Sequence, residues 1–246
     1  TRRLSRHSSH HSRYHPAMTT MATALAAVRT RLDETTATSW TDAEIRAWIN
    51  EGVADIARRT ESIQKSATIN VVAGTQNYTS LPADLLRLNR VEFISAGAQG
   101  QVTHLELREL NALDSTWYGG KQASSGRPLY CGISGYPPVL QLTLYPIPAE
   151  NGATLKVYYY ASPTAIATNG TADSSTLDLP TGWDDLVYEY ATYLAQRRDA
   201  NPSWQDTKRI YEEHLGDMLA MTERWHDQPG FISNDAFDDG FGYGGW

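Results

Sequence analysis

Acidic and histidine side chains gather at two places where catalysis or metal binding would be sought first. One is the run Glu-Glu-His at 212–214, and the other comprises Asp184, Asp185 and Glu189. A helical zinc site needs two histidines one turn apart, and the first place has one. Acids in the first turn of a helix stabilise its N-terminal end, which suffices to explain Asp184. Neither place predicts a catalytic or metal site.

The remaining candidates for chemistry are equally sparse. Cys131 is the single cysteine of the chain, which excludes an intrachain disulfide and a site built from several thiolates. It lies in an expected strand, where a buried and unreactive thiol is the usual case. His104 and His226 stand alone, and the sequence contains neither a phosphate-binding glycine loop nor a nucleophile elbow. We therefore expect no catalytic residue, no metal, no cofactor and no enzymatic activity.

The formal net charge of −7 is unevenly distributed. Residues 1–17 contain Arg2, Arg3, Arg6 and Arg13 and no acid, so this arm carries +4 and the remainder −11 (−7 minus 4). A basic arm on an acidic body suggests separate partners, either DNA or a neighbouring subunit for the arm. No apolar run approaches the roughly 20 residues that cross a bilayer, so we expect no membrane contact.

Aromatic residues form a second candidate feature, with three consecutive tyrosines at 158–160 and a Trp-Tyr pair at 117–118. Aromatic side chains on strands can stack on sugars or bases. More often they fill a core and form cross-strand pairs. Strand alternation places Tyr159 on one face and Tyr158 and Tyr160 on the other, so at least one face is expected to pack inside.

The elements that would position these residues begin with a helical region over 21–63. Thr41 and Glu44 have the spacing of a capping box, and Trp40 and Ile45 that of a hydrophobic staple. Gly52 lowers helix propensity by about 1 kcal/mol relative to alanine, which suggests close packing at that point. The apolar face of this helix is expected to hold Ile45, Trp48, Ile49, Val53 and Ile56.

Between about 66 and 180 the apolar pattern changes to alternation, which predicts strands. The expected strands cover 67–71, a short stretch through Tyr78, 86–94, 129–133, 140–144 and 155–160. Pro146, Pro148 and Asn151-Gly152 separate the last two, which suggests that these two strands form a hairpin. A short helix is expected over 104–117.

Residues 183–225 predict a pair of helices. Trp183, Leu186, Val187, Tyr190, Ala191 and Leu194 recur at helical steps, and Asn201-Pro202-Ser203 interrupts the pattern. The next helix carries an apolar face of Tyr211, Leu215, Met218, Leu219 and Trp225. The short break favours an antiparallel pair.

These elements predict an α+β fold. It would combine a helical bundle, made of a long N-terminal helix and a C-terminal antiparallel helical hairpin, with an inserted and mostly antiparallel β domain. The expected segments are a basic arm (1–17), bundle helices (18–65), the β domain (66–182), the helical hairpin (183–225) and an extended tail (226–246). The tail is rich in glycine and aromatic residues and cannot fold alone, which indicates assembly with a partner.

The order of these pieces resembles the head-to-tail adaptor, or connector, proteins of tailed bacteriophages over roughly residues 21–225. The segments that carry the resemblance are WTDAEIRAWINEGVADIARR, ATINVVAGTQNYTSLPADLLRLNRVEF, HLELRELNALDSTW, GRPLYCGI, LQLTLYPIPAENGATLKVYYYASP and LPTGWDDLVYEYATYLAQRR.

The resemblance implies a non-enzymatic structural protein of the virion neck, made in the host cytoplasm. It also implies a ring of about twelve identical subunits beneath the portal vertex. Such a ring extends the DNA channel from the portal protein to a tail nozzle or other neck protein, and double-stranded DNA passes through without sequence-specific binding. The C-terminal segment of the family docks on the portal. By position and composition, the anchors here would be Phe231, Phe237, Phe241, Tyr243 and Trp246.

Two other functions stay open. The chain could be a tail-associated receptor- or glycan-binding module that uses the β domain and its tyrosines. Exposed, coplanar rings in a concave site would favour that module, and buried rings would favour the adaptor. Alternatively, the arm could bind DNA, although +4 would neutralise only a few phosphates and give weak, salt-sensitive affinity.

Overall fold

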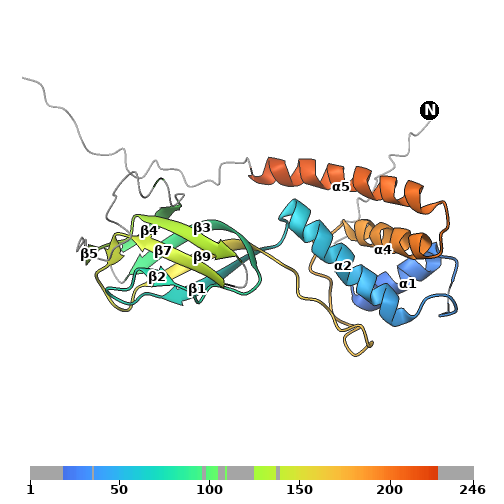
Figure 1. Cartoon of the computed structure of the whole chain (residues 1–246), viewed down its shortest axis with the longest axis horizontal. Coiled ribbons are helices and arrows are strands. Elements are labelled where there is room, and N and C mark those ends of the chain that lie inside the picture. The colour runs from blue at the N-terminus through green and yellow to red at the C-terminus, as the bar shows by residue number, and fades with distance from the viewer. Residues whose placement is uncertain are drawn as a thin grey trace, which may run out of the picture. The chain divides into compact units, whose positions relative to one another are not determined.

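The computed structural model describes residues 19–34, 36–95, 98–104, 109, 125–136 and 139–226, and the fold is mixed α+β (Figure 1). The helices are α1 (Met21–Arg31), α2 (Asp42–Thr60), α4 (Asp184–Arg198) and α5 (Trp204–His226). The strands are β1 (Gln64–Asn70), β2 (Asn77–Tyr78), β3 (Leu85–Ser95), β4 (Ala98–His104), β5 (Ser125–Gly126), β6 (Tyr130–Tyr136), β7 (Val139–Tyr145), β8 (Ile147–Pro148) and β9 (Thr154–Ala161).

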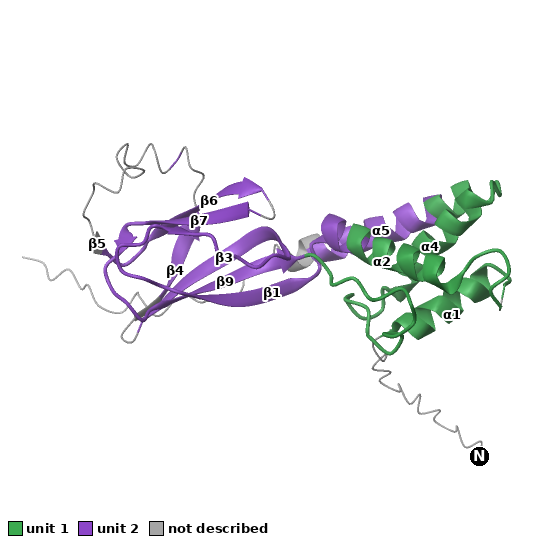
Figure 2. Ribbon diagram, turned by 60° about the horizontal axis from the view of Figure 1, so that its bottom comes forward, with its two compact units in different colours: residues 1–55, 162–208 green, residues 56–161, 209–246 purple. Residues whose placement is uncertain are grey.

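The chain separates into two compact units (Figure 2). Unit 1 comprises residues 1–55 and 162–208, and unit 2 comprises residues 56–161 and 209–246. Unit 1 is helical in its described part, and unit 2 contains the strands.

The helical region expected over 21–63 contains two helices, of which α2 is the long one. α1 ends at Arg31, and Asp33 adopts a φ of 54°, which lies outside the right-handed helical region. The carboxylate of Glu34 then accepts the backbone N–H groups of Thr38 and Ser39. The connecting segment therefore satisfies its backbone locally and does not continue the helix.

The capping box at the start of α2 is confirmed. The N–H of Thr41 donates to the Glu44 carboxylate at 2.9 Å, and the N–H of Glu44 donates to the Thr41 hydroxyl at 3.3 Å. Behind this cap, the expected apolar face is buried except for the half-buried Trp48, with Ile45, Ile49, Val53 and Ile56 inside. The local sequence signals therefore placed the beginning and the buried face of α2 correctly.

Close packing at Gly52 is also confirmed. A β-carbon at this position would lie 3.0 Å from Cδ1 and 3.2 Å from Cβ of Tyr190 on α4. The Tyr190 hydroxyl donates to the Glu51 carboxylate at 2.9 Å, which holds the ring against α2. Because glycine has no side chain, the Tyr190 ring can pack directly against the backbone of α2 at Gly52.

Two arginines in unit 1 are buried and paired with carboxylates. Arg46 donates from Nε and Nη2 to the two oxygens of Asp173 at 2.8 and 2.7 Å. Arg29 donates from Nε to Asp42 at 2.9 Å and from Nη2 to the carbonyl oxygen of Trp40 at 3.0 Å. A buried guanidinium without such partners would be strongly destabilising, so these pairs fix α1, α2 and the segment containing Asp173 against one another.

Residues 162–183 follow the helices of unit 1 as an extended segment. Asn50 holds this segment to α2, because its amide donates to the carbonyl of Ile166 at 2.7 Å and accepts the N–H of Ile166 at 3.0 Å. Next to α1, the N–H of Leu177 donates to the carbonyl of Thr19 at 2.9 Å. The segment therefore obtains its backbone partners from the helices.

In unit 2, seven strands form one sheet in the order β1-β9-β3-β4-β6-β7-β2. All neighbours are antiparallel except β4 and β6, which are parallel. A separate parallel pair is formed by β5 and β8. The expectation of a mostly antiparallel β region is therefore confirmed.

One apolar cluster lies inside this sheet. It joins Leu155 and Val157 of β9 to Leu142 and Leu144 of β7, although three strands lie between β9 and β7 in the sheet order. A flat sheet could not bring these side chains together, so the sheet curls around its own core. Cys131 of β6 belongs to the same cluster.

The expected hairpin between strands 140–144 and 155–160 is wrong. β7 pairs with β6 and β2, whereas β9 pairs with β1 and β3. Pro146 and Pro148 have no N–H to donate to a hairpin ladder, and β8, which contains Pro148, pairs with β5. The intervening residues therefore lead the chain across the sheet to its other half.

The helix expected over 104–117 lies outside the described residues, apart from His104, which ends β4, and the helical Glu109. In the C-terminal region α4 and α5 are present, but Trp183 precedes α4 as its N-cap and is half-buried. α4 also buries Glu189, Thr192, Tyr193 and Ala195, so it is buried on more sides than a one-faced pattern predicts.

Replacing Gly52 with leucine should destabilise the protein. The larger side chain would overlap the Tyr190 ring, and overpacking of this kind costs about 1–3 kcal/mol. Urea denaturation would measure the free energy of unfolding. Gly216→Ala on α5 is the matched control, because a β-carbon there has no atom within 4 Å. That change should stabilise the protein by up to about 1 kcal/mol, and equal effects of both changes would contradict the packing of Gly52.

The carboxylate of Glu44 should make stability depend on pH. Hydrogen bonds from the N–H and hydroxyl of Thr41, and then from Arg198, lower the pKa of Glu44 from 4.5 to about 2. Because the folded-state pKa is the lower one, ionised Glu44 stabilises the fold above about pH 4.5, and this contribution is lost as the pH falls towards 2. Above about pH 4.5, the wild type should unfold at a higher urea concentration than Glu44→Gln, and at low pH the two urea midpoints should coincide. A difference that persists at about pH 2 would contradict this assignment.

Candidate functional site

The site residues predicted from the sequence lie outside the described residues. This holds for the anchors Phe231, Phe237, Phe241, Tyr243 and Trp246 and for the arm residues Arg2, Arg3, Arg6 and Arg13. Their roles stay predictions.

The acidic groups considered for chemistry are paired with arginines. In unit 1, Arg31 lies 2.6 Å from the carboxylate of Asp185 and 3.9 Å from that of Glu189. In unit 2, Arg59 lies 2.7 Å from the carboxylate of Glu212. Across the described ranges, no group of three or more His, Cys, Asp or Glu side chains is placed to hold a metal ion. These acids therefore serve as ion-pair partners.

The thiol of Cys131 is enclosed by the apolar core of the sheet. The side chain is fully buried, and this burial raises the pKa of the thiol to about 12. A nucleophilic cysteine needs a lowered pKa and access to substrate. Cys131 has neither and acts as a small core residue.

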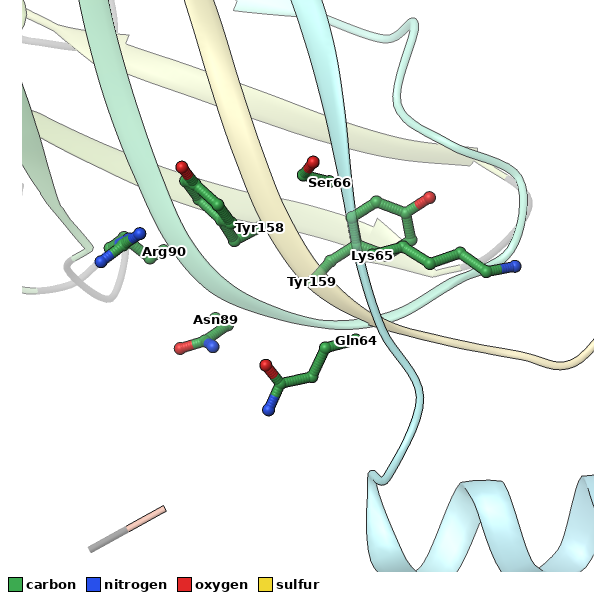
Figure 3. A pocket seen from close by; sticks show the side chains of 7 residues that line it. All are labelled: Gln64, Lys65, Ser66, Asn89, Arg90, Tyr158 and Tyr159. Carbon is green, nitrogen blue, oxygen red and sulfur yellow. The ribbon is translucent and has the colours of Figure 1, made fainter. Parts of the chain in front are cut away.

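A polar pocket of about 460 Å³ opens on the β1-β9-β3 part of unit 2 (Figure 3). Asn89 lies at its rim as the extra residue between the pairs Leu88–Tyr159 and Arg90–Tyr158, where the ladder between β3 and β9 shifts register. Such bulges re-aim side chains and are common near functional sites. The lining residues are Gln64, Lys65, Ser66, Asn89, Arg90, Tyr158 and Tyr159.

The tyrosines at this pocket do not present open ring faces. The Arg90 guanidinium lies 4.2 Å and the Lys156 ammonium 5.0 Å from the ring centre of Tyr158, and the Tyr158 hydroxyl donates to Glu92 at 3.1 Å. Tyr159 and Tyr160 are both buried. Cation–π contacts therefore use the face of Tyr158 that a sugar would need for stacking.

Tyr159 is hydrogen-bonded to Asp84, the residue that precedes β3. Its hydroxyl donates to one carboxylate oxygen of Asp84 at 3.0 Å, and Lys65 donates to the other at 3.0 Å. Burial alone would raise the pKa of Asp84, but these two hydrogen bonds outweigh it and hold that pKa below 3.8. Burial, together with the negative Asp84, raises the pKa of Tyr159 to about 12. Tyr159 thus stays a neutral donor and not an acid–base group.

A surface that the sequence analysis missed lies where β6 ends and β7 begins. Tyr136 and Val139 are register partners there, and their side chains are 88% and 72% exposed. The sequence signal that would have pointed to this surface is the absence of charge from all residues between Arg127 and Glu150. Chemical sites are indicated in a sequence by charged and nucleophilic side chains, and the stretch around this surface contains no charged residue.

These features define a class of protein. The described residues offer packing and contact surfaces, Asp185 and Glu212 are paired with arginines, and the one thiol is enclosed in an apolar core. None of the helices within the described ranges is both long and apolar enough to span a bilayer. Packing and contact surfaces of this kind are what structural proteins present to their partners.

The comparison with protein families identifies which kind. The model of the SU10 adaptor protein family matches residues 19–231, so the chain belongs to this family of phage adaptor proteins. The resemblance to head-to-tail adaptors is thereby confirmed, and a structural, non-enzymatic role follows from the family. No curated protein matches the chain.

Cys131 should resist thiol reagents in the native protein. Both the burial and the raised pKa of the thiol oppose formation of an accessible thiolate. Labelling with a chromogenic disulfide reagent at mildly alkaline pH should be slow in buffer and should reach one thiol per chain in urea. Fast, complete labelling of the native protein would contradict the placement of Cys131 in the core.

Proposed function

We propose that the chain is a ring-forming head-to-tail adaptor that binds the portal protein and extends the DNA channel to the tail machinery. About twelve identical subunits, the number that the family resemblance implies, would form a closed ring in the virion neck. A tail nozzle or another neck protein would bind its far side. The single observation that carries this proposal is the adaptor-family match over residues 19–231, which includes all the described helices and strands.

Portal binding is assigned to the C-terminal tail. In residues 227–246, Phe231, Phe237, Phe241, Tyr243 and Trp246 are separated by glycines and acids. Aromatic anchors on such a segment gain affinity by filling pockets on an ordered partner, against the entropy lost on ordering. A ring multiplies these weak contacts, because each bound copy raises the effective concentration of the next tail.

The proposal keeps the five segments expected from the sequence, which are the basic arm, the bundle helices, the β domain, the helical hairpin and the docking tail. The body without the arm carries −11, and like charge would keep DNA phosphates from adhering during passage. Double-stranded DNA would therefore pass through the lumen without sequence-specific binding. The Arg-containing arm would contact DNA or an acidic surface of a neighbouring subunit.

The competing function is a receptor- or glycan-binding module. That function requires aromatic rings with open faces in a concave site. The pocket in Figure 3 is concave, but Arg90 and Lys156 cover Tyr158, and Tyr159 is buried. This geometry argues for the adaptor over the module.

Native mass spectrometry of the purified chain, alone and with the portal protein of its phage, tests the proposal. We expect the chain alone to be largely monomeric and to join portal rings at about one copy per portal subunit. A stable trimer that ignores the portal would support the receptor-binding module instead.

Removing residues 227–246 should abolish portal binding without changing the melting temperature. Under this proposal the role of the tail is to bind the portal, so the fold should not depend on it. A full-length variant with alanine at the five aromatic anchors keeps the length and charge of the tail and should fail in the same way. If the truncated chain melted at a lower temperature, the tail would belong to the fold and this role would be wrong.

A further inference from the structure

The exposed end of the β6–β7 pair is unusual in its lack of charge. The 22 residues from Pro128 to Ala149 contain no Asp, Glu, Lys, Arg or His, in a chain in which 20% of residues are charged. This stretch includes β6, β7 and β8. Exposed sheet edges are normally protected from unwanted pairing by charges, especially lysine, and this stretch contains no such charge.

Tyr136 and Val139 form the apolar surface at this end, which we call the β6–β7 tip. They are the two most exposed of the large hydrophobic side chains in the described part of the chain. Single exposed hydrophobic residues are normal on monomers, but here two lie opposite each other as register partners. Adjacent exposed apolar side chains mark interaction sites.

The tip has a defined backbone geometry. Gly135 adopts a φ of 87°, and a β-carbon at this position would lie 2.2 Å from the carbonyl oxygen of Val139. Only glycine allows this approach without displacing the backbone. The two strands therefore hold Tyr136 and Val139 in a fixed relation before any partner binds, which lowers the entropy cost of binding.

We propose that the β6–β7 tip is the surface through which one copy of this chain docks on the next copy in the ring. The inference rests on the proposed function, because it requires a ring. Each copy carries a net charge of −7, so copies repel one another. A contact between like-charged copies is least opposed where the surface has no charge.

The same reasoning disfavours other occupants. DNA binding requires cations that neutralise phosphates, and the stretch around the tip has none. A partner protein of different composition could use charges complementary to this acidic chain. In a ring with more than two subunits the contact is heterologous, so the tip must meet a different surface of its neighbour.

Photo-cross-linking tests the inference directly. p-Benzoylphenylalanine replaces Tyr136 in the full-length chain, which is irradiated in portal-bound rings and, separately, free at high concentration. We expect a product of twice the chain mass in the portal-bound rings, with the cross-link joining the tip to a different segment of the second copy. The same replacement at Val72, which is 52% exposed on the same unit, should give little of this product.

A charge substitution provides an independent measurement. Tyr136→Asp with Val139→Asp should lower the affinity between copies by roughly tenfold or more, as loss of a buried apolar anchor does. Binding to the portal should then fill sites independently and not cooperatively. Val72→Asp should leave cooperativity unchanged. Circular dichroism of each variant would establish that it is folded.

Several outcomes would overturn the inference. These are a tip-to-tip cross-link, a cross-link to the portal or a tail protein, or no double-mass product in either preparation. The proposed function is judged separately by portal binding of the wild-type chain. Portal binding without a copy-to-copy cross-link rejects the tip contact alone, whereas a chain that cross-links to itself and ignores the portal rejects the adaptor role.

Discussion

Strand β9 is the constraint on which unit 2 depends, because it is hydrogen-bonded on both sides, to β1 along seven residues and to β3 across a bulge. A strand paired on both sides must send alternate side chains to opposite faces of the sheet. Leu155, Val157 and Tyr159 therefore enter the core, and Lys156 and Tyr158 remain outside. Because both edges of β9 are occupied, β7 pairs with β6 and β2 instead.

The features predicted correctly from the sequence are those set by nearby residues. The Thr41–Glu44 capping box spans three residues, and the steps of Ile45, Ile49, Val53 and Ile56 repeat within one helix. The hairpin was mispredicted because strand pairing is decided over long separations, and alternation in 155–160 fits any partner of the right polarity. β4 was missed for a different reason: it pairs locally with β3, but its sequence AQGQVTH has Val102 as its one large apolar residue and so shows no alternation.

The partners of buried arginines are a second feature that sequence patterns do not predict. Arg46 was placed on a helix, but its partner Asp173 lies 127 residues away in a segment without regular structure. No periodic pattern links the two, although the cost of an unpaired buried charge makes such a partner necessary. Exposed apolar residues are hard to predict for a different reason. Tyr136 and Val139 follow the same alternation as core residues and differ from them only in remaining exposed to solvent.

The start of β1 and the end of β9 lie next to each other in space, although they are far apart in the sequence. The N–H of Ala161, at the end of β9, donates to the carbonyl of Ile63, just before β1, at 2.9 Å. An insert whose two ends meet can be exchanged for another with equally close ends, because the host helices need not shift to accommodate it. A single recombination event between related phage genes can therefore exchange this β domain as a unit, while the helical sequence on either side is inherited intact.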